Sequence, residues 1–440
     1  MSPTPFFSLL LTGMFLSSSI VQASASALST QVSAVFDSVI YGDNVGGQGT
    51  YMLQEALGIY NVHAEHNTGG HNHAGTLDAG FNFRGVELAV NTQLPGWFDG
   101  RLLVTSNGKE AMIEEAWLRT QFLPAGLQLK GGKLFSDVGY LNNQHPHAWD
   151  FVDQALPYQM LFGGSLRGDG VQVSWLAPTA FYLRLGAEAV NSGNAGVAAY
   201  VGPTTATNGL PINFASASTW PAVVTAFAKV GGAFGLNHEL QTGLSWVHSR
   251  QHQELHYAHP GINEAKHGLQ GSAEMMGLDV VYKYYAFRNN GAGDFKLQAE
   301  YWYQNKDTFL IYHELKPGLV GQPRDLYLDA AYVQALYGIA PRWQVGLRYD
   351  IAGILHEARR DEATVGPTNT SAFDSMDRYS AVLSWRIRDN QQLRLQLSQA
   401  YVAVPEDTNG DGVDEAVRRT FNQVFLQYQI ALGSHAAHRF

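Results

Sequence analysis

Apolar and polar residues alternate along most of the chain that follows residue 28, in segments of about ten residues. In residues 342–351, every second position from Trp343 to Ile351 is apolar, and the positions between them are polar or glycine. Residues 181–189 and 295–303 follow the same period. This pattern predicts β-strands with one face toward hydrocarbon and one toward water, and helical spacing is nearly absent. Alternation alone fits a soluble sandwich as well as a membrane barrel.

Three further features favour a transmembrane antiparallel β-barrel. Short connections alternate with long ones, as expected for short periplasmic turns and long external loops. Tyr and Trp cluster near the inferred strand ends, which suits two interfacial girdles. The last segment places Val424, Leu426, Tyr428, Ile430 and Leu432 on one face. The short turns are predicted at residues 94–100, 123–126, 177–179, 340–342 and 389–390. Counting the segments predicts about 16 strands.

The chain is predicted to contain a leader and one further domain. Residues 1–27 hold an apolar run followed by Ala23-Ser24-Ala25, a triplet typical of signal-peptide cleavage sites. Residues 28–440, with no linker to divide them, are predicted to form the barrel. The first strand begins almost directly after the leader, so we expect no plug domain. The terminal Phe440 resembles the signal that the barrel assembly machinery recognises. Outer-membrane lipids and a homo-trimer are the other expected partners.

The overall charge and the missing cysteines exclude several classes of function. A net charge of -10 without a Lys/Arg cluster argues against nucleic-acid binding. With no cysteine, any metal site must use His and carboxylate groups. The chain shows no GxSxG, HExxH or phosphate-binding glycine loop, so we do not expect an enzyme.

The inferred lumen face carries charges of both signs, which we expect mainly to pair across neighbouring strands and keep the wall wet. The predicted pore-wall residues are Glu115, Arg119, Arg184, Glu188, Lys296, Glu300, Arg348 and Asp350. Residues 137–168 form the third external loop, which is too rich in aromatic residues for open water. We therefore expect it to fold into the barrel as a constriction. The candidate constriction residues are His145, His147, Trp149, Asp150 and Asp153. Metal binding and hydrogen bonding to the wall are both open for the two histidines.

The stretch KGGKLFSDVGYLNNQHPHAWDFVDQ and the ending LGSHAAHRF resemble a group of His-rich proteobacterial outer-membrane proteins related to zinc receptors. The chain is also distantly similar to phosphate-selective porins. The resemblance covers residues 81–173 and the last strand. It implies transport across the cell envelope, with metal as a candidate cargo.

Two sets of loop residues are candidate metal ligands. Clustered imidazoles can hold zinc or a related metal, although polar loop decoration is the simpler interpretation. The candidate histidines are His63, His66, His71, His73, His248, His252, His256 and His259. Asp407, Asn409 and Asp411 follow the spacing of a calcium loop, but Arg418 replaces the glutamate at its last position. A weak calcium site and a plain acidic turn remain alternatives.

Two functions compete on this basis. The first is a porin-like channel for small polar solutes or ions, narrowed by the third external loop. The alternative is a His-rich outer-membrane receptor for zinc or a related metal.

Overall fold

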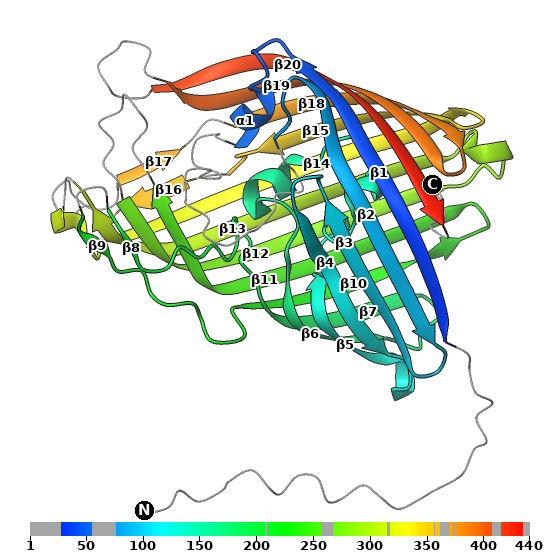
Figure 1. Ribbon diagram of the computed structural model, residues 1–440, viewed down its shortest axis with the longest axis horizontal. Coiled ribbons are helices and arrows are strands. Elements are labelled where there is room, and N and C mark those ends of the chain that lie inside the picture. The colour runs from blue at the N-terminus through cyan, green and yellow to red at the C-terminus, as the bar shows by residue number, and fades with distance from the viewer. Residues whose placement is uncertain are drawn as a thin grey trace, which may run out of the picture.

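The structure is a computed structural model and describes residues 28–54, 76–206, 209–256, 267–314, 317–355, 357–360, 369–372, 375–406 and 415–433. Sixteen antiparallel strands form a closed barrel in which β1 pairs with β20 (Figure 1). The prediction of about 16 strands is confirmed. The wall strands are β1 (Ser29–Asp43), β2 (Gly80–Leu94), β3 (Phe98–Ser106), β4 (Ala111–Thr120), β5 (Leu127–Phe135), β6 (Arg167–Leu176), β7 (Tyr182–Asn191), β10 (Val223–Phe234), β11 (His238–His256), β12 (His267–Tyr284), β13 (Phe295–His313), β14 (Pro323–Ala340), β15 (Trp343–Ala352), β18 (Met376–Arg388), β19 (Gln391–Glu406) and β20 (Glu415–Gly433).

The connections carry short elements of their own. The hairpin of β16 and β17 extends the sheet beside β14. These elements are α1 (Gly49–Gln54), η1 (Pro124–Gly126), η2 (Pro146–Ala148), η3 (Tyr158–Phe162), β8 (Thr204–Thr205), β9 (Pro211–Ile212), η4 (Asn289–Gly291), η5 (Pro317–Leu319), β16 (Glu357–Arg360) and β17 (Asn369–Ala372). Within the described ranges, no helix is long and apolar enough to cross a membrane.

Short and long connections lie at opposite ends of the barrel, as the sequence predicts. β14 and β15 are joined by residues 341–342, and β18 and β19 by residues 389–390. The five predicted turns all fall at this end, which is termed the turn end. The opposite, loop end carries long connections such as residues 136–166, although residues 107–110 between β3 and β4 form a short one.

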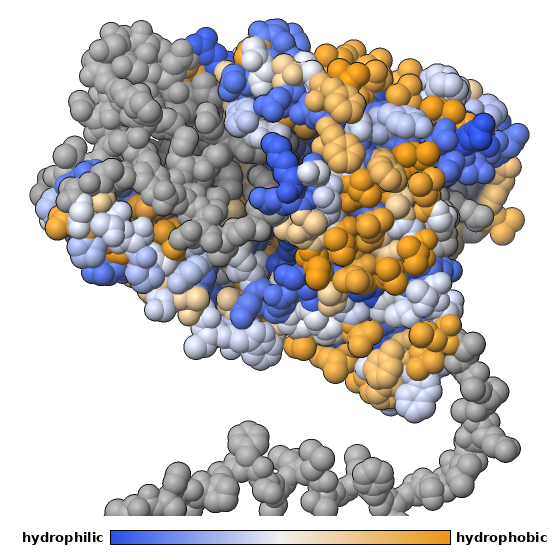
Figure 2. Space-filling model, in the orientation of Figure 1, coloured by the Kyte–Doolittle hydropathy of each residue, from blue (hydrophilic) through white to orange (hydrophobic). Residues whose placement is uncertain are grey.

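The outer surface of the barrel is apolar. In β20, Val424, Leu426 and Tyr428 are exposed, whereas Gln427 and Gln429 point into the barrel. Figure 2 shows hydrophobic side chains gathered over this part of the wall, with polar residues toward the loop end. At the turn end, Trp343 and Trp385 stack with ring centroids 5.2 Å apart. Such a belt with flanking aromatic rings is the surface that lipid contact requires.

The wall is much taller on one side than on the other. β11 and β13 contain 19 residues each, whereas β5 contains 9. A membrane-spanning strand needs about 9–11 residues, so β11–β14 continue well beyond the bilayer toward the loop end (Figure 1). The expectation of ten-residue segments is wrong for these strands. Their alternation continues into polar positions such as Lys306, which is buried, and Asp307, which is exposed.

Candidate functional site

Residues 136–166 connect β5 to β6 and are here termed the inner loop. They fold into the interior of the barrel (Figure 1). Val138, Leu156 and Leu161 are completely buried. Phe162 meets the inward-facing Trp302 of β13 edge-on, with ring centroids 4.8 Å apart. The main hydrophobic core therefore forms where the inner loop packs against the wall.

Glu300 of β13 is the most heavily bonded anchor of the inner loop. Its carboxylate accepts five hydrogen bonds, which is one more than the roughly four lone-pair sites of this acceptor-only group. The longest of them, from Trp302, therefore shares Oε2 with two shorter ones. Gly139 makes the approach possible, because its φ is 61° and a Cβ there would overlap Glu300. The donors are Tyr140 N at 3.1 Å, Tyr158 Oη at 2.7 Å and Trp302 Nε1 at 3.3 Å to Oε2, and Leu141 N at 2.9 Å and Tyr332 Oη at 2.6 Å to Oε1.

Two arginines and two aspartates form a buried four-charge cluster. Arg348 donates to Asp153 at 2.6 Å and to Asp350 at 2.9 Å. Arg378 donates to the same carboxylates at 2.6 and 3.1 Å. Burial opposes ionisation of Asp153 in the inner loop, but Arg378 and Arg348 outweigh it and lower its pKa to about 2. The cluster ties the loop to β15 and β18.

Two further contacts hold the inner loop to other parts of the wall. Asp150 pairs with Lys296 of β13 at 2.7 Å. At the start of the loop, Glu188 of β7 accepts the backbone N–H of Asp137 at 2.9 Å. The Asp137 carboxylate in turn pairs with Arg184 at 2.7 Å. Charges of the wall are therefore matched by charges of the loop.

His145 and His147 bond to wall carboxylates, which is one of the two interpretations that the sequence leaves open. His145 Nε2 lies 2.8 Å from Glu115, and its Nδ1 lies 3.6 Å from Glu114. His147 Nδ1 lies 2.7 Å from Glu87 of β2. The two imidazoles are nearly parallel, with centroids 5.8 Å apart. Burial disfavours the charged form of His145, but the adjacent carboxylates of Glu114 and Glu115 outweigh this and raise its pKa to about 9.

The raised pKa of His145 predicts a loss of stability at alkaline pH. The folded-state pKa of about 9 exceeds the ordinary 6.5. The contribution of protonated His145 to the unfolding free energy is therefore complete below pH 6.5 and is lost as pH rises through 9. It amounts at most to about 3 kcal/mol. We expect the unfolding free energy in detergent to fall between pH 6 and pH 10 by more for the wild type than for His145→Gln. Equal pH slopes for the two proteins would contradict the assignment.

The predicted wall residues all point into the barrel, but they serve mostly as anchors. Arg119 differs, because it pairs with Asp99 on the neighbouring strand β3 at 2.5 Å. Glu87 and Arg378 are functional candidates that the sequence prediction missed. The alternation in β18, where Arg378 and Ser380 are buried and Tyr379 is exposed, is a signal that could have placed Arg378. Trp149 is buried beside Arg84, whose guanidinium lies 5.9 Å from the ring centroid.

Two polar cavities lie on either side of the inner loop. The one at the turn end has a volume of about 420 Å³ and is lined in part by His145 and His147. The other, toward the loop end, has about 280 Å³ and is lined in part by Pro146 and Glu87. Consecutive loop residues thus border opposite cavities. The segment 145–147, held against β2 and β4, separates them.

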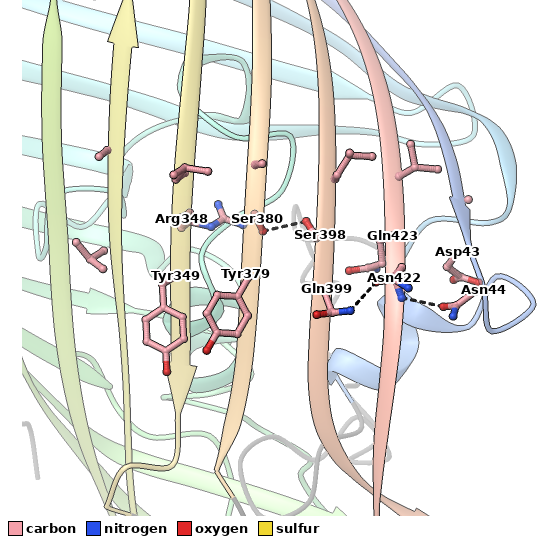
Figure 3. A pocket seen from close by; sticks show the side chains of 17 residues that line it. Asp43, Asn44, Arg348, Tyr349, Tyr379, Ser380, Ser398, Gln399, Asn422 and Gln423 are labelled. Atoms are coloured by element: carbon pink, nitrogen blue, oxygen red, sulfur yellow. Dashed lines mark hydrogen bonds between the residues drawn. The ribbon is translucent and has the colours of Figure 1, made fainter.

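A larger groove of about 990 Å³ lies on the outer face of the wall rather than inside it (Figure 3). Outward-facing Leu347, Tyr349, Tyr379 and Leu397 line it, and Figure 3 shows the two tyrosines side by side on β15 and β18. Their ring centroids are 4.9 Å apart. Because its lining belongs to the apolar belt, this groove faces lipid and does not connect the two ends of the barrel.

The histidines of β11 are not arranged as one metal site. His248 faces outward and stacks on Trp246, with centroids 5.9 Å apart. His252 is buried inside, where its Nε2 bonds Glu254. An irregularity in pairing between Ser249 and His252 separates them. His248 and His252 therefore lie on opposite faces of the wall, and metal binding by either of them stays a prediction. In the part of the chain that the structure describes, no three His, Asp or Glu side chains gather as a metal site.

Several predicted features lie outside the described residues and stay predictions. The leader 1–27 is one of them, and Phe440 is another. For His256, only the backbone is described. The metal and calcium candidates outside the described residues are His63, His66, His71, His73, His259, Asp407, Asn409 and Asp411.

Comparison with known proteins finds one relative in sequence and several solved structures with a similar fold. No protein-family profile matches the chain. An uncharacterized protein of Aquifex aeolicus (strain VF5) is 29% identical over 380 residues, which cover 85% of this chain and 73% of that protein. The trimer form of OmpT, an outer membrane protein of Vibrio cholerae, aligns with a TM-score of 0.50 at 10% identity, covering 92% of this chain and 100% of OmpT.

Two further solved structures have similar coverage. The outer membrane channel DcaP of Acinetobacter baumannii aligns with a TM-score of 0.49 at 13% identity over 92% of this chain and 97% of DcaP. The anion-selective porin from Comamonas acidovorans has a TM-score of 0.49 at 9% identity over 92% of this chain and 100% of the porin. The chain is a porin-like barrel of the Gram-negative outer membrane, because its closed ring of strands, lipid-facing belt and asymmetric connections together define that architecture.

Proposed function

We propose that the protein is an outer-membrane channel for small polar solutes, narrowed by the inner loop at residues 145–147. The observation that supports it is the pair of polar cavities of about 420 and 280 Å³ that lie on either side of this segment. With short turns facing the periplasm, the larger cavity is the periplasmic vestibule and the smaller one is the external vestibule. Solutes would pass between the inner loop and strands β1–β4, next to the contact of His147 with Glu87.

Charged groups on both sides of this passage suit hydrated solutes. Arg84, Asp37 and Glu87 border the external vestibule, and Arg101 borders the periplasmic one. A wall of this kind keeps water in the pore and favours polar over apolar solutes. The inner loop itself is fixed by buried ion pairs, so the passage is a permanent narrowing rather than a freely moving lid.

The absence of cysteine allows a direct test of the passage. In planar bilayers we expect discrete conductance steps for the wild type and for His147→Cys. A charged methanethiosulfonate reagent should lower the conductance of His147→Cys by at least half, because the attached group occupies the narrowing. The cysteine-free wild type should not respond.

The matched control is Leu347→Cys, whose side chain lies on the lipid-facing surface and is 67% exposed there. Its conductance should be unchanged by the reagent. Absence of conductance steps would contradict the channel function. Equal responses of the two cysteine variants would contradict the proposed path. Gel mobility with and without heating verifies that each variant is folded.

The alternative of a zinc receptor and the grouping with zinc-related proteins have no support in the described residues. They stay predictions for the external histidines, and calorimetry with zinc on wild type and a variant of His63, His66, His71 and His73 tests them. A homo-trimer, the form named for the OmpT structure, is proposed for this chain as well. The mass of the purified protein in detergent measures it. The predicted lack of enzymatic activity likewise stays a prediction.

A further inference from the structure

The periplasmic vestibule carries an excess of positive charge. Its lining contains five Lys and Arg residues, namely Arg101, Lys283, Lys296, Arg386 and Arg394. Among the described residues that line it, two are acidic, Asp150 and Asp389. In a chain with a net charge of -10, this local surplus runs against the overall composition. Such a surplus inside low-dielectric walls concentrates anions.

Nearby carboxylates neutralise only part of this charge. Arg101 lies 3.4 Å from Glu115, and Lys296 pairs with Asp150 at 2.7 Å. Asp389 is engaged by Arg342 of the β14–β15 turn at 3.1 Å. Among the residues that the structure describes, no carboxylate oxygen lies within 4.0 Å of a side-chain nitrogen of Lys283, Arg386 or Arg394. Three cations of the vestibule are thus left without an ion pair.

Arg394 is the least compensated of the three. It is only 4% exposed, and its Nη groups donate to the neutral amides of Gln427 and Gln392, each at 3.0 Å. Its Nε has no hydrogen-bond partner among the described residues. A buried guanidinium without a carboxylate in direct contact is costly, and an anion can supply that contact. Because Arg394 lines the vestibule, that anion can come from solution.

Arg386 and Arg394 lie close enough to act together. Arg386 lies directly opposite Gln392 in the β18–β19 ladder, and Arg394 is two residues further along β19. Such diagonal positions are about 7–8 Å apart at the backbone, within reach of long side chains. Lys283 lies on β12 opposite Lys296, so a second pair of like charges adds to the field.

We propose that Arg386 and Arg394 form a binding site for a small dianion in the periplasmic vestibule. Two guanidinium groups match two negative charges, and each can hold an oxyanion with parallel N–H donors. The volume of about 420 Å³ admits a small organic or inorganic anion with part of its hydration shell. The inference deepens the proposed function by naming a solute class, and the role of the site in permeation rests on that function.

Calorimetry on the folded protein in detergent tests the site itself. Sodium sulfate and disodium succinate are the probes, and sodium chloride at equal ionic strength is the reference. We expect at least one dianion to bind and Arg386→Gln and Arg394→Gln each to weaken it about tenfold, as expected for the loss of one charge-assisted contact. The stronger ligand decides between an inorganic oxyanion and a dicarboxylate.

Arg388→Gln is the matched control, because Arg388 lies on the same strand at the same end but is exposed and does not line the vestibule. Its affinity should equal that of the wild type. Arg394→Lys keeps the charge and should recover part of the affinity, which separates recognition from a folding defect. Failure of both dianions to bind, or unchanged affinity in both Arg386→Gln and Arg394→Gln, would overturn the proposal.

Bilayer recordings separate this proposal from the channel itself. If the site and channel both exist, the bound dianion should reduce the chloride current more from the periplasmic side than from the external side. Arg386→Gln should lower the chloride-to-potassium permeability ratio at least twofold. Dianion binding without conductance steps would contradict the channel function and support the binding site. Conductance steps without dianion binding would contradict the binding site and support the channel function.

Discussion

Replacement of Arg378 by Met is expected to lower the unfolding free energy by about 3–5 kcal/mol, because it leaves a buried negative charge without its partner. Arg378 is completely buried and contacts Asp153 and Asp350 at 2.6 and 3.1 Å. After the change, Arg348 alone faces two carboxylates. Urea unfolding in detergent, followed by tryptophan fluorescence, measures the loss.

The same variant should also alter conductance. Asp153 belongs to the inner loop, so a weaker cluster loosens the loop and should give larger and noisier current steps. Arg388→Met changes the exposed end of the same strand and should affect neither property. Adding Asp153→Asn to Arg378→Met restores the charge balance of the cluster and should recover part of the stability. Additive losses in the double variant would refute coupling within the cluster.

Glu300→Gln is expected to be destabilising by about 4 kcal/mol, despite the near-identical shape of the two side chains, because unpaired buried donors each cost about 1–3 kcal/mol. Each Glu300 oxygen accepts from at least two donors: Oε1 from Leu141 N at 2.9 Å and Tyr332 Oη at 2.6 Å. A glutamine amide must turn its NH₂ toward one of these groups, where donor would face donor.

Glu239→Gln provides the comparison for this change. Glu239 is exposed at the turn end and accepts one hydrogen bond, from Tyr285 Oη at 3.0 Å. Its replacement should change the unfolding free energy by less than about 0.5 kcal/mol. If the two glutamine variants unfolded at the same urea concentration, Glu300 would not be an anchor of the inner loop.

The barrel wall was predictable from local pattern, because the alternation of apolar and polar residues within each strand determines which side chains face lipid and which face the interior. Residues 342–351 place Leu347 outside and Arg348 inside, as the structure has them. The turn at residues 389–390 was equally local. The length of β11–β14 could not be predicted from the sequence, because the pattern of a membrane strand carries no signal for how far the strand continues beyond the lipid.

The partners of the wall charges could not be predicted, because they depend on how distant segments meet. Asp153 and Arg378 are separated by 225 positions in the chain. Their contact requires both the register of the barrel and the path of the inner loop. Sequence alone therefore indicated that the charges face inward and left open whether they pair with neighbouring strands, with the loop or with solute.

The anchoring of the inner loop also constrains the order of assembly. Residues 136–166 are far in sequence from several of their partners, since Val152 N bonds Gln396 of β19, 244 positions later. Contacts so distant in sequence form late and slowly. The loop can reach its final position only once β13, β15, β18 and β19 are in place. Correct burial of the loop therefore reports that the whole wall has been built in register.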